Sequence, residues 1–330
     1  MGAKKLSRWL SRFSKVKALV VGDLMADHYV YGQTERVSRE APVLIVRHQE
    51  EVVKLGGGAN AAANARALGA SVTALGALGS DPMGAELTRL FRAQGITVAA
   101  ESARGVPTET KTRVLAGAFS TTRQQMLRID RGAPLPLPEP LRKKLAKRIE
   151  REAAKADVVI VSDYGAGVLG EETRGALLRQ ARLGKRVCAD SRFALASWAG
   201  ATVCKPNEPE LAAITGLPVG TEGEVMRAGI AALDRLHCEV LLVTRGRNGM
   251  VVFHRGQATF LPVHGVEDAV DVTGAGDTVH ATFAIALAAG ASPVEAAHLA
   301  NIAGGLVVQK LGTATVTREE LADELALYGA

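Results

Sequence analysis

Short apolar runs alternate with helical patterns along most of this 330-residue chain, and this alternation constrains its fold more than any other feature. The apolar runs predict strands at 18–23, 71–79, 157–165, 185–191, 201–207 and 239–246. They show little polar alternation, as expected for strands that are covered on both faces. Helix-like stretches separate them, for example at 60–69, 171–184 and 224–236. The β-α-β-α order predicts an α/β fold, a three-layer αβα sandwich with a mainly parallel sheet.

Two stretches interrupt this order. Residues 29–53 and 107–129 alternate in polarity and carry no helical pattern. We expect them to pair into a small β lid outside the main sheet. Such a lid would cover the carboxyl ends of the parallel strands, where sheets of this kind bind ligands. No repeat or low-complexity linker is present, so we predict a single domain over residues 1–330 with these two lid segments inserted in it.

Charge and cysteine content exclude several classes of protein. The net charge is +6, from 40 basic and 34 acidic side chains that are mostly scattered. The run at 142–155 mixes both signs, which is typical of a solvated helix face. Without a dense basic patch and interleaved aromatic residues, we expect no nucleic-acid binding, whereas a mild positive excess suits an anionic small substrate. The three widely spaced cysteines indicate free thiols in a reducing compartment.

The amino-terminal stretch is basic and amphipathic. Leu6, Trp9, Leu10 and Phe13 share one face of a helix, which favours packing on the chain's own domain. The stretch has neither the apolar core nor the cleavage pattern of a signal peptide. No window of 18 apolar residues free of charge is present. We therefore expect a cytoplasmic protein with no membrane contact.

The stretch "DVTGAGDT" (271–278) predicts a site for phosphoryl transfer. Gly274, Ala275 and Gly276 present three backbone amides with little side chain in the way, at the apparent start of a helix. Such a turn can hold an anion, and phosphoryl transfer needs preorganised donors around its charged oxygens. Asp277, beside that cradle, can take the proton of an attacking hydroxyl. An Asp that merely capped its own helix would not need the three small residues.

Two further stretches offer polar groups at predicted strand ends. The cluster "LGGGANAAANARALG" (55–69) precedes a helix, so its amides are available to a ligand, although tight packing explains such glycines equally well. Asp23 and Asp27 follow the first strand. At the carboxyl end of a strand, a carboxylate can accept hydrogen bonds from sugar hydroxyls, or it can cap the loop. For Asp23 the sequence favours neither role over the other. Asp27 favours the ligand, since it lies where the lid begins.

Two more stretches suit a nucleotide and its metal. In "CKPNEPEL" (204–211), Asn207 and Glu210 are oxygen ligands three residues apart, and magnesium near a nucleotide needs only one or two such groups. Lys205 can meet a phosphate as a point charge. The alternative is a helix start with ordinary capping. "LVTRGRNG" (242–249) is a strand with a glycine turn, which suits a nucleotide pocket or, taken alone, a hairpin.

Three of these motifs resemble the signatures of one family, the ribokinase-like (PfkB-type) carbohydrate kinases. "DVTGAGDT" resembles the second signature, "GGGANAAAN" the first, and "NEPE" the N-x-x-E magnesium motif. The likeness runs in order from Val20 to about Thr317. The resemblance implies a three-layer α/β sandwich with a small β lid, and an enzyme that uses ATP and Mg²⁺.

Within that family the chain is most similar to the D-glycero-D-manno-heptose 7-phosphate kinases of lipopolysaccharide core synthesis. The stretches that carry this likeness are 22–43, 161–169, 271–279 and 310–317. Those kinases phosphorylate the anomeric oxygen of the sugar and often continue into an adenylyltransferase domain. This chain has no H-x-G-H motif, so we expect any second activity to lie elsewhere. The alternatives are a kinase of another sugar, sugar phosphate or nucleoside, and a non-catalytic scaffold that binds sugar or nucleotide.

The resemblance also assigns roles to individual residues. Asp277 matches the catalytic base, and the anion hole matches Gly274, Ala275 and Gly276. Sugar-binding positions match Asp27, Gly56, Gly57 and Asn60. The magnesium motif matches Asn207 and Glu210, and the nucleotide site matches Thr244, Gly246 and Asn301. A monovalent cation, such as K⁺, is held in many members at the positions of Asp271, Thr273 and Gly312. Family members often form a homodimer through the lid.

The chain departs from the heptose kinases at two lysine positions. Those kinases usually carry "DY-x-K-G", where this chain has Ala166, and Asp-Pro-Lys, where it has Asp190-Ser191-Arg192. A substrate with a phosphate far from the reacting hydroxyl needs cations near the lid, and arginine offers a bidentate fork to phosphate. Our candidates for that contact are Arg36, Arg113 and Arg192.

Overall fold

The computed structural model describes residues 3–118, 123–133, 135–265 and 269–327. A mainly parallel sheet forms its centre, in the strand order β13-β12-β11-β10-β9-β8-β1-β4-β5. Only β12 and β13 run antiparallel to their neighbours. The strands are β1 (Lys17–Gly22), β4 (Ser71–Leu75), β5 (Thr97–Val98), β8 (Val158–Asp163), β9 (Arg186–Ser191), β10 (Val203–Cys204), β11 (Val240–Thr244), β12 (Met250–His254) and β13 (Gln257–Leu261).

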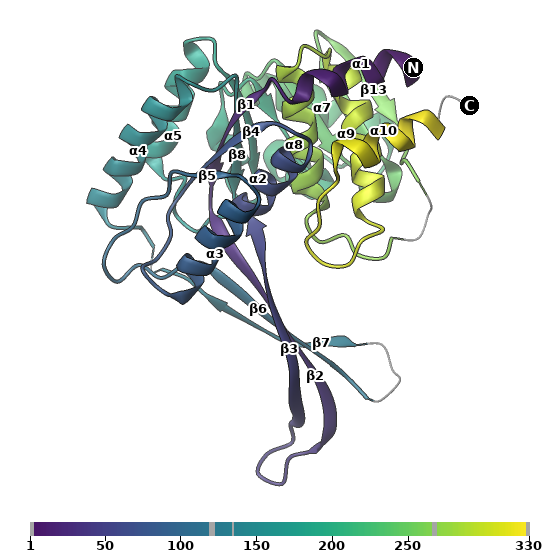
Figure 1. Ribbon diagram of the computed structural model, residues 1–330. Helices are drawn as coiled ribbons and strands as arrows, with labels where there is room; N and C mark the ends of the chain where they lie inside the picture. The colour runs from purple at the N-terminus through teal and green to yellow at the C-terminus, as the bar shows by residue number, and fades with distance from the viewer. Residues whose placement is uncertain (1–2, 119–122, 134, 266–268, 328–330) are drawn as a thin grey trace.

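Helices cover both faces of this sheet, as Figure 1 shows. One apolar core includes side chains of α1 (Ala3–Phe13), α2 (Gly58–Ala67), α3 (Pro82–Ala93), α8 (Ala275–Ala288), α9 (Pro293–Val307) and α10 (Arg318–Leu327). The other includes those of α4 (Glu139–Ala153), α5 (Glu171–Arg182), α6 (Glu208–Thr215) and α7 (Glu222–Leu236). Within β1, Val20 belongs to the first core and Leu19 and Val21 to the second, because successive strand side chains point to opposite faces. The predicted three-layer sandwich is confirmed.

The two predicted interruptions form a separate sheet of order β3-β2-β6-β7. Its strands are β2 (Leu24–Val37), β3 (Leu44–Gly57), β6 (Thr110–Gly117) and β7 (Gln124–Arg131). This lid projects from one end of the main body (Figure 1). The first lid segment is longer at both ends than the predicted range 29–53. Strand β2 starts two residues after β1 ends, and β3 runs directly into α2. The lid strands therefore carry residues straight from the carboxyl edge of the main sheet.

Helix α1 packs on the domain as its apolar face predicted. Leu6, Trp9, Leu10 and Phe13 are all buried in the first core. Among the described helices, none is both long enough and apolar enough to cross a membrane. The three cysteines are free thiols, and Cys188 and Cys204 are buried.

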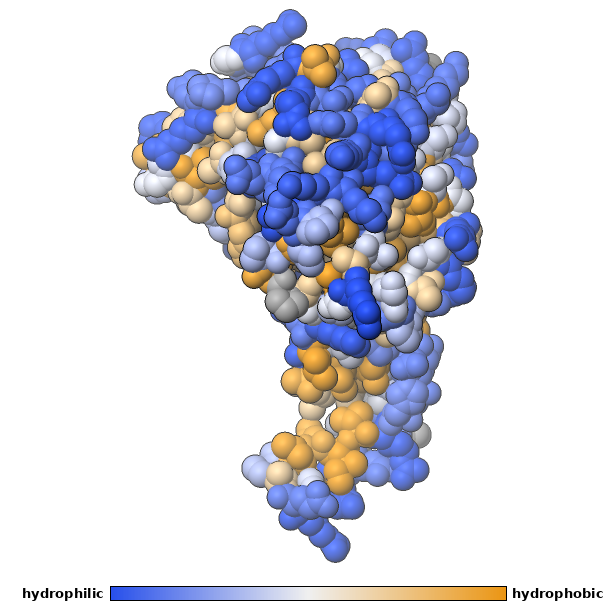
Figure 2. All heavy atoms as spheres, turned by 90° about the vertical axis from the view of Figure 1, so that its left-hand side faces the viewer, coloured by the Kyte–Doolittle hydropathy of each residue, from blue (hydrophilic) through white to orange (hydrophobic). Residues whose placement is uncertain are grey.

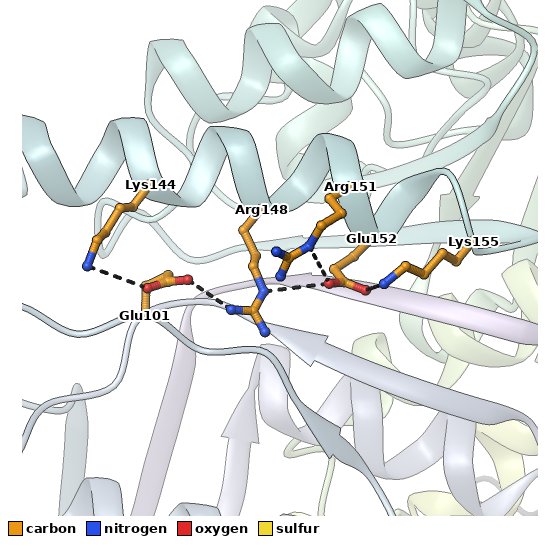
Figure 3. Close-up of polar contacts among 6 residues, drawn as sticks. All are labelled: Glu101, Lys144, Arg148, Arg151, Glu152 and Lys155. Carbon is orange, nitrogen blue, oxygen red and sulfur yellow. Dashed lines mark hydrogen bonds and ion pairs between the residues drawn. The ribbon is translucent and has the colours of Figure 1, made fainter.

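Helix α4 carries an ion-pair network that reaches Glu101, in the segment after β5 (Figure 3). Arg148 lies between Glu101, at 3.2 Å, and Glu152, at 3.6 Å. Arg151 and Lys155 contact Glu152 as well, at 3.1 and 2.7 Å. The cations in this network are between one third and two thirds exposed. The basic side chains of the mixed-charge run are thus partly solvated, whereas Glu101 and Glu152 are 18% and 13% exposed.

Candidate active site

The stretch 271–278 forms the start of α8, with Gly274 as the residue that precedes the helix. Gly274 has a φ of 80°, a left-handed conformation that favours glycine. A Cβ there would lie 2.6 Å from Nδ2 of Asn60. The N–H of Ala275 donates to Val272 O at 3.2 Å, whereas those of Gly274 and Gly276 donate no hydrogen bond within the described residues. Two of the three predicted amides thus remain available to an anion.

Asp277 lies in the first turn of α8 and is 3% exposed. Its carboxylate accepts two side-chain hydrogen bonds, from Asn60 Nδ2 to Oδ2 and from the Tyr164 hydroxyl to Oδ1, each 2.9 Å long. Burial raises the pKa of Asp277 to about 7, and Asp190 adds to this rise, while both hydrogen bonds and the charge of Lys205 oppose it. A carboxyl group with a pKa near neutrality suits a general base.

An ion pair with a buried lysine flanks Asp277. Lys205, directly after β10, contacts Asp190 of β9 at 2.8 Å, and its side chain is 5% exposed. Burial lowers the pKa of Lys205, but Asp190 raises it above its ordinary value, so the ammonium stays charged. A Cβ at Gly276 would lie 3.8 Å from Lys205 Nζ. A permanent cation therefore stands beside the amides at the start of α8.

The predicted sugar-binding residues converge on the same place. Asp27 of β2 is buried, and a Cβ at Gly56 of β3 would lie 2.5 Å from its Oδ2. Arg113 of β6 contacts Asp27 Oδ1 at 2.5 Å. Gly57 has a φ of 54° where β3 turns into α2, and Asn60 in the first turn of α2 reaches the base. Asn60 of α2 thus connects the end of the lid strand β3 to Asp277.

Of the two roles considered for Asp23, sugar binding and loop capping, the structure shows loop capping. Its carboxylate accepts backbone hydrogen bonds from Tyr164, Ala166 and Val168, at 2.8, 3.1 and 3.2 Å. Burial raises its pKa to about 6 against the effect of these bonds. Asp23 therefore shapes the loop after β8 that carries Tyr164.

Asn207 and Glu210 form a capping box at the start of α6. Glu210 Oε2 accepts the N–H of Asn207 at 2.9 Å, and Asn207 Oδ1 accepts that of Glu210 at 2.8 Å. Burial raises the pKa of Glu210, Asp190 adds to this rise, and Lys205 opposes it. Glu210 Oε1 accepts no hydrogen bond within the described residues. A divalent cation would relieve the repulsion between the carboxylates of Glu210 and Asp190. The oxygen atoms of Asn207 and Glu210 therefore fit Mg²⁺.

The predicted nucleotide residues lie at the neighbouring strand end and on α9. Thr244, at the end of β11, forms a bridge with Asn207, and its N–H donates to Pro206 O at 3.0 Å. Gly246 has a φ of 52° in the turn that follows. Asn301 of α9 donates to Pro262 O at 2.7 Å.

The three residues predicted to hold a monovalent cation form one hydrogen-bonded junction. Asp271 accepts the N–H groups of Thr273 and Gly312, at 2.9 and 2.8 Å. Burial alone would raise the pKa of Asp271, but these bonds hold it below its usual value. Lys54 of β3 donates to the carbonyl groups of Leu311 and Thr313, on either side of Gly312, at 3.3 and 3.2 Å. The junction thus offers an anionic oxygen, with a lysine ammonium already beside it.

The three arginines proposed for a remote phosphate are not equivalent. Arg36 is exposed on the outer part of β2, and Arg192 is exposed just beyond β9. Arg113 is engaged with Asp27. Sequence reasoning missed two other residues, Tyr164 and Lys111. Nζ of Lys111 lies 5.1 Å from the centre of the Tyr164 ring. The available signal was position in the sequence, since Lys111 lies two residues before Arg113 and Tyr164 lies near the end of the predicted strand at 157–165.

Comparison with known proteins decides the family. The profile of the pfkB family carbohydrate kinases matches residues 15–320. This chain belongs to that family. Among its relatives, "Bifunctional protein HldE" of Paramagnetospirillum magneticum is 42% identical over 324 residues, and the protein of that name from Mesorhizobium japonicum is 39% identical over 323. These matches cover 96% and 97% of this chain but 65% and 64% of the relatives.

Solved structures of a ribokinase and a phosphofructokinase share the fold. Arabidopsis thaliana ribokinase, complexed with ribose and ATP, has a TM-score of 0.73 at 23% identity, with 94% of this chain and 98% of that chain covered. Escherichia coli phosphofructokinase-2, in complex with substrates and products, has a TM-score of 0.78 at 20% identity, with 96% and 99% covered. At these identities the likeness concerns the fold alone, and it agrees with the architecture in Figure 1.

Proposed function

We propose that this chain is an ATP-dependent sugar kinase that phosphorylates the anomeric hydroxyl of D-glycero-D-manno-heptose 7-phosphate to give the 1,7-bisphosphate. The observation that carries this proposal is Asp277, a buried carboxylate with a raised pKa beside two free amides and a charged lysine. Family membership supports the kinase, and relatives at about 40% identity together with the resemblance to heptose kinases support the sugar.

In the proposed reaction, the anomeric oxygen attacks the γ-phosphorus and its proton passes to Asp277. The bond between the γ-phosphorus and the bridging oxygen breaks, and ADP leaves. Asn60 and Tyr164 orient the carboxylate so that one lone pair faces the hydroxyl. Charge on the transferring phosphoryl group is stabilised by the N–H groups of Gly274 and Gly276 and by Lys205, which need no reorganisation during the reaction.

Asn207 and Glu210 would hold Mg²⁺, directly or through water. When bound, the ion supplies charge neutralisation between the phosphate groups. Thr244, Gly246 and Asn301 would line the nucleotide site, and the junction of Asp271, Thr273 and Gly312 would hold a monovalent cation such as K⁺. Asp27, Gly56, Gly57 and Asn60 would bind the sugar hydroxyls, with Asp27 held in place by Arg113.

Two further proposals concern the setting of this activity. Apolar side chains are exposed along the lid, and Figure 2 shows them gathered on its surface. These include Val37, Val43, Leu44, Met126, Leu127 and Ile129. Their exposure supports a homodimer through the lid, because such patches mark interaction surfaces. Free thiols and the use of ATP support a cytoplasmic location.

The test is ATP turnover by the purified chain with a panel of acceptors: heptose 7-phosphate, free hexoses, pentoses and fructose 6-phosphate. We expect heptose 7-phosphate to have the highest kcat/KM. A higher value for another acceptor would replace the proposed sugar. Nucleotide binding without turnover of any acceptor, across a broad nucleoside and sugar panel, would favour the non-catalytic scaffold.

A further inference from the structure

Lys111 is a half-buried cation that faces the site from the lid. It pairs in register with Asp27, and Arg113 lies two residues further along the same strand. Since residues two apart on a strand share a face, Lys111 lies on the face that carries the contact between Arg113 and Asp27. The side chain of Lys111 therefore belongs to the inner surface of the lid.

The ammonium group of Lys111 lies next to the ring of Tyr164. Its Nζ lies 5.1 Å from the centre of the Tyr164 ring, while the hydroxyl of that ring donates to Asp277. The phenol thus separates the ammonium from the base. A group that contacts Lys111 would lie away from the reacting hydroxyl, as the remote end of a phosphorylated sugar does.

Lys111 forms no ion pair with any of the residues that the structure describes. Asp27 and Asp130 favour its charge electrostatically, and each is engaged by an arginine, Arg113 and Arg128. Burial raises the pKa of the half-buried Glu109, and the charge of Lys111 opposes this rise. Burial lowers the pKa of Lys111, and the charges of Arg128 and Arg192 lower it further. Desolvating a cation beside other cations is unfavourable, so an anion bound there would be stabilised.

We propose that Lys111 binds the remote phosphate of the substrate and makes the site specific for a phosphorylated sugar, with Arg192 as a second contact. This inference rests on the proposed kinase function and names the residue that selects the substrate class. The loop after β8 reads Gly165-Ala166-Gly167, so it supplies no charged side chain there. Lys111 brings a positive charge to the same loop from the lid side.

The test compares Lys111→Met with the wild-type chain on heptose 7-phosphate and on unphosphorylated heptose. Methionine fills a similar volume without the charge. We expect kcat/KM for the phosphorylated sugar to fall about 10- to 100-fold, as for a lost charge-assisted hydrogen bond. The value for free heptose and the KM for ATP should change less than about twofold. If free heptose reacts too slowly, its inhibition constant against the phosphorylated sugar serves instead.

Two variants serve as controls. Lys111→Arg retains the charge and should recover most of the selectivity. Arg47→Met removes a charge from an exposed part of the lid, where the side chain is 73% exposed, and should leave the selectivity unchanged. Thermal melting of each variant checks that it folds, and should Lys111→Met fail to fold, Lys111→Gln takes its place.

The outcomes separate this inference from the proposed function. An equal loss on both sugars, or no loss on either, overturns the role of Lys111. A wild-type preference for another sugar phosphate, lost in Lys111→Met, rejects heptose as the substrate but supports Lys111. A wild-type preference for unphosphorylated sugars overturns both.

Discussion

Two regions of this molecule gather charged side chains, and they differ in what surrounds the charges. At α4, the cations that pair with Glu101 and Glu152 (Figure 3) are 31% to 67% exposed. Around Asp277, the proposed base, Lys205 is buried as well, and its ion-pair partner Asp190 is 19% exposed. Burial raises the pKa of Asp277 to about 7, whereas Arg148, Arg151 and Lys155 of the α4 network keep 31%, 59% and 64% of their side-chain surface in water.

The comparison shows that a concentration of charge does not by itself mark an active site. At the surface, an ion pair contributes about 0–1 kcal/mol, because water competes for both partners. In the interior, each charge depends on a few fixed donors, so changing one group alters its neighbours. We therefore expect substitutions in the buried cluster to change activity and those on α4 to change almost nothing.

The largest effect is expected at the base itself. Asp277→Asn keeps the shape of the side chain but removes its ability to accept a proton, so kcat should fall roughly 10²- to 10⁴-fold. Nucleotide affinity, measured by calorimetry, should remain within a few-fold of the wild type. Turnover close to that of the wild type would exclude Asp277 as the base.

A smaller effect is expected at the metal motif. Glu210→Gln removes an anionic oxygen and should raise the Mg²⁺ concentration for half-maximal rate by about 10- to 100-fold. Glu224→Gln is a matched control, because Glu224 forms the same capping box with Thr221 at the start of α7. If both variants keep the wild-type Mg²⁺ dependence, Glu210 serves only to cap α6.

We expect Tyr164 to adjust the pKa of Asp277, without accepting the proton itself. Its hydrogen bond lowers the pKa of Asp277 and so opposes the rise caused by burial. Because Asp277 must be ionised to act, activity should rise with pH through about 7. Tyr164→Phe should move this limb of the kcat profile to higher pH by up to about one unit, the equivalent of one net hydrogen bond. An unmoved limb would show that Tyr164 does not act through the base.

The smallest effect is expected on α4. Arg148→Met removes the central cation of the network, which is about one third exposed, and should lower the free energy of unfolding by no more than about 1 kcal/mol. Neither kcat nor KM should change. Urea denaturation and the ADP-release assay measure the two quantities, and a tenfold loss of activity would contradict the distinction between the regions.

Local features of the site could be predicted from the sequence to a large extent. The βα order, the lid interruptions and the small residues before Asp277 are properties of neighbouring residues, so their pattern is visible in the chain. The sequence also indicated that Asn207 and Glu210 act together. It left two possibilities for them, a magnesium motif and a helix cap, and the structure shows the capping box. Spacing alone does not distinguish them, since a cap and a metal motif both place oxygens three residues apart.

The contacts of the base could not be predicted in this way. Tyr164 and Asn60 reach Asp277 across 113 and 217 residues of sequence, and only the shared carboxyl edge of the parallel strands brings them together. Likewise, Lys111 faces the site because the parallel register of β2 and β6 sets it opposite Asp27. The sequence by itself determined the elements and the chemical groups available, because these depend on neighbouring residues. Tertiary structure alone decided which charges are buried together, because burial and register depend on segments far apart in the chain.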